Sequence, residues 1–164
     1  MKKPCLILAL IMFGALTSFA QKYEKYTNHR YFFSIEYPSD IVKIQPPVFN
    51  GDGRTFLSKD GSVELRSWAN HNVMLHSVEE EARSIEEELK GIPIAYKKIS
   101  DSWFVLSWVD ADKVHYRKTL YHKFKNADVF FTFTIEYPRA QKPKFDAIVR
   151  RIEKSFTFDP NADV

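Results

Sequence analysis

Arginines that stand near a tryptophan on alternating segments are the side chains of this sequence best suited to binding chemistry. In residues 62–69, alternation leaves Arg66 and Trp68 on the face opposite the apolar residues. In residues 113–124 it leaves Arg117 on the polar face as well. A tryptophan ring offers a flat apolar surface, and a guanidinium pairs with carboxylate or phosphate. The candidate ligand-binding residues are therefore Arg54, Arg66, Trp68 and Arg117.

The same pattern also has a purely structural interpretation. If a helix covers this face, Trp68 belongs to an ordinary core and the arginines form its salt-bridged rim. The many phenylalanines and tyrosines alternate with polar residues as the core rings of a sheet do, which favours packing over carbohydrate binding. Exposure of Trp68 would favour binding.

Patterns for metal binding or nucleophilic catalysis are missing from the sequence. Residues 50–61 are rich in Asn and Asp, but Thr55 and Gly61 stand where a calcium loop needs its Gly and Glu. The histidines form no His-Glu-x-x-His motif, and no Gly-x-Ser-x-Gly elbow occurs. We therefore predict no metal site, no cofactor and no catalytic residue.

The elements that must position these side chains are mainly short strands joined by tight turns. Residues 31–37 alternate and are followed by Pro38, which lacks the amide hydrogen that a ladder needs. Residues 54–58 and 62–69 form a predicted hairpin, because Asp60-Gly61 supplies the left-handed backbone of a tight turn.

A helix is predicted to begin at Ser77, where Glu80 completes a capping box. Lys90, Gly91 and Pro93 should end it. A second helix is predicted over residues 143–155, with a proline in its first turn. Between the helices lies a predicted four-strand meander at residues 94–99, 103–109, 113–124 and 129–137.

The first residues of the chain have the features of a cleavable export signal. Lys2 and Lys3 are followed by an apolar stretch that is shorter than a membrane span, and small residues precede a plausible cut after Ala20. Cys5, the only cysteine, precedes the apolar stretch and so is not placed to carry a lipid. We expect residues 1–20 to be removed, and the protein to be periplasmic or secreted without stable insertion in the membrane.

The remainder of the chain has the size and composition of one folded domain. Residues 21–158 are predicted to form that domain, and residues 159–164 a loose tail. No cysteine remains after the signal, so stability must come from a packed core. Removing two lysines lowers the net charge from +3 to +1, which excludes the strongly basic profile of a nucleic-acid-binding protein.

An aromatic strand that ends in Tyr37-Pro38, followed by the Asn-Gly-Asp-Gly-Arg of residues 50–54 and by Asp60-Gly61, resembles the PsbP-like (Mog1/PsbP) fold group and its exported bacterial members. The resemblance covers nearly all of the chain after residue 20 at the level of element order. It implies an α+β fold in which an antiparallel sheet of about six to seven strands packs with two main helices in an α/β/α sandwich. It also suggests accessory or binding roles more than catalysis, and no active-site motif of that group is matched.

These observations favour an exported, non-enzymatic binding or accessory domain of the bacterial cell envelope, with a partner protein or a small ligand. A hydrolase-like enzyme with a site assembled from distant loops is one alternative, and a structural envelope protein is another. A cleft with two close carboxylates would favour the enzyme, whereas a flat face with exposed Trp68 would favour binding.

Overall fold

The computed structural model describes residues 21–47 and 50–164. The predicted signal segment, with its cut after Ala20, lies outside the described residues, so its removal stays a prediction. The strands are β1 (Tyr23–Asn28), β2 (Phe33–Pro38), β3 (Val42–Ile44), β4 (Gly53–Ser58), β5 (Glu64–His71), β6 (Ile94–Ser100), β7 (Trp103–Asp110), β8 (Lys113–Lys123), β9 (Asp128–Pro138) and β10 (Thr157–Phe158). The helices are α1 (Val78–Glu88), a short 3-10 helix (Arg139–Gln141) and α2 (Lys142–Ser155).

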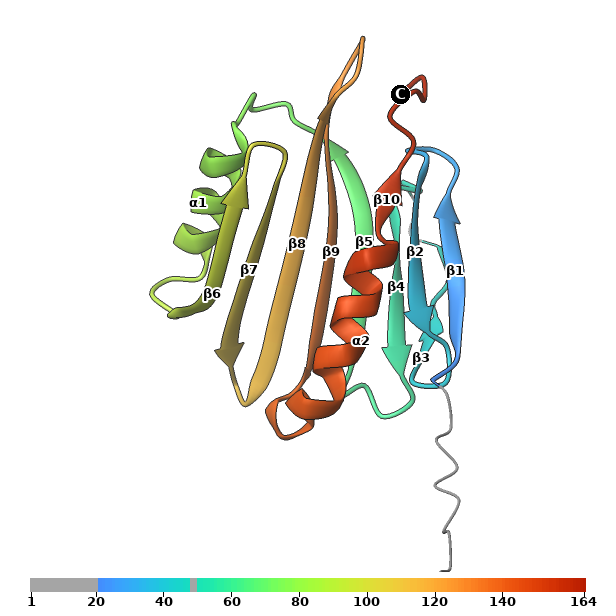
Figure 1. Ribbon diagram of the computed structural model, residues 1–164, viewed down its shortest axis with the longest axis vertical. Helices are drawn as coiled ribbons and strands as arrows, with labels where there is room; N and C mark the ends of the chain where they lie inside the picture. Colours follow the sequence, from blue (N-terminus) through green and yellow to red (C-terminus); the bar gives the residue numbers. More distant parts are fainter. Residues whose placement is uncertain (1–20, 48–49) are drawn as a thin grey trace, which may run out of the picture.

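An antiparallel sheet of seven strands forms the centre of the fold, in the order β3-β4-β5-β9-β8-β7-β6 (Figure 1). Strand β9 thus lies between β8, which precedes it directly in the sequence, and β5, which is distant in the sequence. Helix α1 packs on the β6–β7 end of one face, and α2 lies on the opposite face. Each helix covers only part of its face, and this offset creates the surfaces described below.

The predicted hairpin and first helix are confirmed, because local sequence is sufficient to define both. Gly61 has a φ of +69° in the turn between β4 and β5, a conformation that costs glycine little. At the start of α1, the backbone N–H of Glu80 donates to the Ser77 hydroxyl, and the Ser77 N–H donates to the Glu80 carboxylate. This capping box satisfies amides that otherwise have no partner in a first helical turn.

The main core lies between the central sheet, α2 and a second sheet of three strands in the order β1-β2-β10. The predicted inward side of residues 31–37 is confirmed, since its alternate aromatic and aliphatic residues are all buried. The predicted second helix is confirmed as α2, and its buried residues are Phe145, Ile148, Val149 and Ile152. A smaller core joins α1 to β7, where Phe104 and Leu106 are fully buried.

The predicted fold class is confirmed, and the four-strand meander corresponds to β6 to β9. The second sheet was not foreseen, because only one residue of β1 is buried and β10 is only two residues long. Within the tail predicted to be loose, Ala162 and Val164 are half-buried and pack against the main core. No helix among the described residues has both the length and the apolarity that a bilayer span requires.

Candidate ligand-binding site

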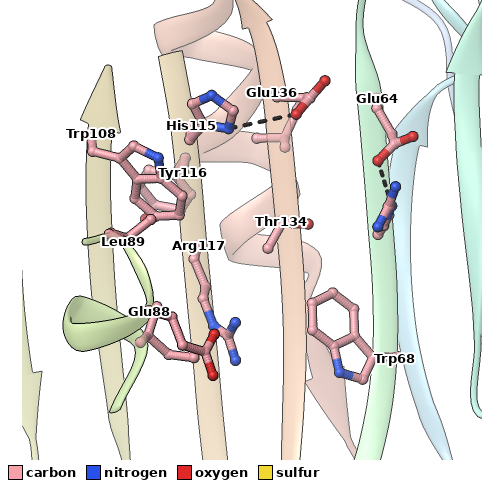
Figure 2. Close-up of a pocket in the computed structure, with 13 residues that line it drawn as sticks. Glu64, Trp68, Glu88, Leu89, Trp108, His115, Tyr116, Arg117, Thr134 and Glu136 are labelled. Atoms are coloured by element: carbon pink, nitrogen blue, oxygen red, sulfur yellow. Dashed lines mark ion pairs between the residues drawn. The ribbon is translucent and has the colours of Figure 1, made fainter. Parts of the chain in front are cut away.

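The face of the central sheet that carries α1 is open beside that helix. Strands β5, β9 and β8 continue past the helix, and a cavity of about 280 Å³ lies there (Figure 2). Its floor is formed by side chains of the strands, and the C-terminal turn of α1 forms one wall through Ile85, Glu88 and Leu89. The site is therefore a half-covered sheet face with a helix along one side.

Strand register places the candidate residues in neighbouring rows. Arg66 on β5 pairs with Thr134 on β9, which in turn pairs with Arg117 on β8. In the adjacent row, Trp68 pairs with Thr132. Opposed residues of antiparallel strands share a face, so Arg66, Trp68 and Arg117 come together across β9.

Arg117 is the most enclosed charged side chain of the site, with 14% of its side chain exposed. Its guanidinium carbon lies 5.6 Å from the centroid of the Trp68 ring, and its Nε donates to the Thr119 hydroxyl at 3.3 Å. The nearest carboxylate in the described part of the chain is that of Glu81, at 3.9 Å from Nη2. Burial lowers the pKa of Arg117, and the negative charges of Glu81 and Glu88 partly offset that effect.

Two of the three carboxylates that line the cavity, Glu64 and Glu136, are paired with cations, whereas Glu88 forms no ion pair with a described residue. Glu64 forms an ion pair with Arg66, which is exposed at the rim. Glu136 contacts Lys113 Nζ at 2.6 Å and His115 Nδ1 at 3.5 Å. Figure 2 shows the pairs of Glu64 and of His115 as dashed lines.

Glu64 and Glu136 are direct partners in the register of β5 and β9, which raises the question of a catalytic carboxylate pair. Each has its own cationic partner, Arg66 for Glu64 and Lys113 for Glu136. Both carboxylates of this pair are thus already in contact with cationic side chains of the sheet.

Two tryptophans supply the apolar surface of the cavity. The Trp108 indole stacks on the His115 ring, with centroids 5.2 Å apart and planes 2° from parallel. Trp68 is half-buried, and α1 leaves it uncovered at the cavity. An apolar group of a ligand can thus contact the rings while an anionic group meets the arginines.

Arg54 is the candidate that the structure does not bring into this cavity. It pairs with Ser67 in the register of β4 and β5, so its side chain lies on the face opposite Trp68. There its guanidinium carbon lies 5.8 Å from the centroid of the Tyr26 ring. Arg54 shares with Arg66 and Trp68 only a hollow of about 480 Å³ at the end of β4.

Several residues of the cavity were not proposed from the sequence. Thr134 and Glu136 alternate with the buried Phe133 and Ile135, so their outward direction was readable from the pattern. Their proximity to Arg66 could not be read from the sequence, because it depends on the pairing of β9 with β5. In the described residues, no group of three or more His, Cys, Asp and Glu side chains could hold a metal ion.

Comparison with known proteins shows which solved structures share this architecture. No protein-family model and no curated protein sequence matches the chain. Among solved structures, the PsbP of the cyanobacterium Synechocystis (CyanoP) matches with a TM-score of 0.60 and 9% identity, over 87% of this chain and 96% of that one. The Saccharomyces cerevisiae Ran-binding protein Mog1p matches with a TM-score of 0.55 and 8% identity, over 87% and 97% of the two chains. A point mutant of Mog1 has a TM-score of 0.54 at 9% identity, over 84% and 96%.

These matches span nearly the whole of each compared protein and 87% of this chain in the first two. At such low identity they establish architecture alone. The resemblance noted from the turn residues and the order of elements is thereby confirmed, and the chain has the PsbP/Mog1 fold.

Proposed function

We propose that this protein is an exported, non-enzymatic binding domain of the bacterial cell envelope, and that it holds an anionic group of a partner at the cavity beside α1. The preferred ligand joins a carboxylate or phosphate to an apolar body. The anion meets Arg117 and Arg66, and the apolar body lies on Trp68 and the α1 wall.

The observation that carries this proposal is the incomplete pairing of Arg117. A guanidinium has five N–H donors, yet in the described residues Arg117 has one hydrogen bond, to Thr119, and one long ion contact, to Glu81. The Arg117 nitrogens that lack a partner are not fully buried, so an acceptor can reach them from the cavity. A ligand anion supplies those acceptors and displaces water from the tryptophan surface.

The fold supports a binding role without identifying the partner. One structural neighbour is named a Ran-binding protein and another a PsbP, and neither name describes an enzyme. The ion-paired state of Glu64 and Glu136 supports binding over hydrolysis. Export is supported by Lys2, Lys3 and the short apolar stretch that precedes Ala20.

The test is affinity capture from the native envelope. The full chain, with its own N-terminal segment and a C-terminal tag, is expressed beside the double variant Arg66→Ala/Trp68→Ala. We expect the wild type to retain a partner or ligand that the double variant loses. Arg83→Ala is the matched control, because Arg83 is an exposed arginine of α1 outside the cavity, with 63% of its side chain accessible.

Recovery of the same molecules by the wild type and by the double variant would remove the cavity as the binding site. Turnover of a captured molecule that is abolished by Glu136→Gln and retained by Arg66→Ala would instead favour the hydrolase-like alternative. Thermal melts of all variants accompany the capture, so that a loss of binding is not confused with a loss of folding.

A further inference from the structure

A second open surface lies on the other face of the central sheet, between α2 and the edge strand β6. Helix α2 packs over β9 and β2, and strands β6 to β8 stay uncovered on that face (Figure 1). The described residues form a cavity of about 640 Å³ there. We call it the α2 groove, and its residues used below are Tyr96, Lys98, Trp103, Tyr116, Lys142 and Arg150.

The α2 groove is long enough for a chain rather than for a single small anion. Trp103 lies at one end of the groove and Tyr137 at the other. Tyr137 is opposite Val114 in the strand register, and Val114 is opposite Val109, which comes six positions after Trp103 on β7. At about 3.3 Å per residue this is a span of roughly 20 Å. An extended peptide of about six residues covers that length.

The α2 groove has an excess of positive charge. Four cations line or border it, Lys98, Lys118, Lys142 and Arg150, against the carboxylates of Asp146 and Glu153. Lys118 Nζ lies 2.8 Å from Glu153, and Lys142 Nζ lies 2.7 Å from Asp146. No carboxylate of the described residues pairs with Lys98 or Arg150, and both side chains are exposed. An acidic ligand would complete this arrangement.

The aromatic side chains favour a peptide over a saccharide. The Trp103 ring centroid lies 5.3 Å from Lys98 Nζ and 5.2 Å from Lys118 Nζ, so ammonium groups already contact the ring on which a sugar would stack. Between the cations, the exposed Tyr96 and the half-buried Tyr116 offer apolar surface, whereas the valines that also line the groove are buried. A peptide whose apolar side chains alternate with acidic ones can contact both these rings and the cations.

We propose that the α2 groove binds an extended acidic segment of a partner protein, with its carboxylates on Lys98 and Arg150 and its apolar side chains on the rings of Tyr96 and Tyr116. This surface is independent of the cavity beside α1, because the two lie on opposite faces of the sheet. The domain would then contact its partners through both faces.

The test is fluorescence anisotropy of the secreted protein with a labelled peptide of about eight residues, in which Glu is interspersed with Val and Tyr. A peptide with Gln in place of every Glu is the matched probe. We expect Lys98→Glu/Arg150→Glu to weaken binding of the acidic peptide at least about tenfold, because two attractions become repulsions. The control Arg83→Glu/Lys125→Glu makes the same charge change outside the α2 groove and should bind as the wild type does.

Equal binding of the Glu and Gln peptides, or an unchanged affinity in Lys98→Glu/Arg150→Glu, would overturn the proposal. Tight binding of an oligouronate together with no binding of the acidic peptide would also overturn it, in favour of a saccharide. Trp68→Ala should leave peptide affinity unchanged; a loss there would show that the peptide occupies the cavity beside α1. Failure of the capture test at that cavity does not affect this result.

Discussion

The guanidinium carbon of Arg117 lies 5.6 Å from the centroid of the Trp68 ring, although the two residues belong to strands separated by β9. The cation and the ring together form the centre of the cavity beside α1. The contact holds a poorly paired positive charge at the floor of an open site, and so a ligand anion would meet a side chain that is already in place.

We expect Arg117→Met to remove ligand binding while the free energy of unfolding changes by less than about 2 kcal/mol. The physical reason is that enclosure already disfavours this charge, as its lowered pKa indicates, and its ion contact with Glu81 is long at 3.9 Å. Glu81 also keeps its contact with His76 Nδ1 at 3.2 Å, so the substitution does not leave that carboxylate without a partner. Urea unfolding and the capture assay measure the two effects, and a loss of several kcal/mol would instead give Arg117 a structural role.

Gly53→Ala should destabilise the protein by about 2 to 3 kcal/mol through overpacking. A Cβ at Gly53 would lie 2.1 Å from the Ser67 carbonyl oxygen and 2.6 Å from the Trp68 Cβ. Gly61→Ala is the contrast, because nothing lies within 4 Å of its added Cβ and only its φ of +69° is unfavourable. The free energy of unfolding of Gly61→Ala should therefore fall by only about 1 kcal/mol. If urea unfolding gave the same loss of unfolding free energy for Gly53→Ala and Gly61→Ala, close packing of Trp68 on β4 would be disproved.

Ser77→Ala should lower the free energy of unfolding by about 1 kcal/mol, because the Glu80 amide loses its cap. Helix α1 forms a wall of the cavity, so fraying of its first turn should also show as faster amide exchange near the N-terminus of the helix. Ser102→Ala is a suitable control, since Ser102 is an exposed turn residue. No difference between the two variants would contradict the capping role.

Asp60 gives the hairpin between β4 and β5 a dependence on pH. Hydrogen bonds from the Ser58 side chain and then from Ser62 lower the pKa of Asp60 from 3.8 to about 2. The folded state therefore binds fewer protons than the unfolded state in this window. The stabilisation that ionised Asp60 gives the folded state is therefore present above pH 3.8 and is lost as the pH falls to about 2.

Asp60→Asn should accordingly be less stable than the wild type near neutral pH, and the two proteins should converge as the pH falls to about 2. Urea midpoints measured across this range check the expectation. A gap between the two midpoints that stays constant down to the lowest pH would show that the charge of Asp60 is not the cause.

The protein recovered after export should begin at Gln21, because the predicted cut follows Ala20. Edman sequencing of the purified protein and its intact mass report the position of the cut. Replacing Lys2 and Lys3 by glutamate should slow export, since the basic start of a signal orients it for translocation. Protein that keeps Met1 and remains in the cytosol would contradict the proposed location.

Local sequence determined the elements whose causes are local. The Ser77–Glu80 box begins α1, Gly61 permits the turn of the β4–β5 hairpin, and Pro38 and Pro138 are the last residues of β2 and β9. Alternation also determined that Arg66 and Trp68 leave the core face of β5, because successive side chains of a strand point to opposite sides. These features depend on neighbours within a few residues.

Only the tertiary structure decided which of the outward side chains meet. Arg117 and Trp68 come together because their strands, β8 and β5, lie on either side of β9. Arg54 is excluded from the cavity because it pairs with Ser67 and lies on the same face of the sheet as that residue. Strand order and register arise from the packing of the whole core, and alternation within one strand does not specify them. The offset of α1 and α2 over the sheet, which leaves both the cavity and the α2 groove open, is likewise a property of packing between distant segments.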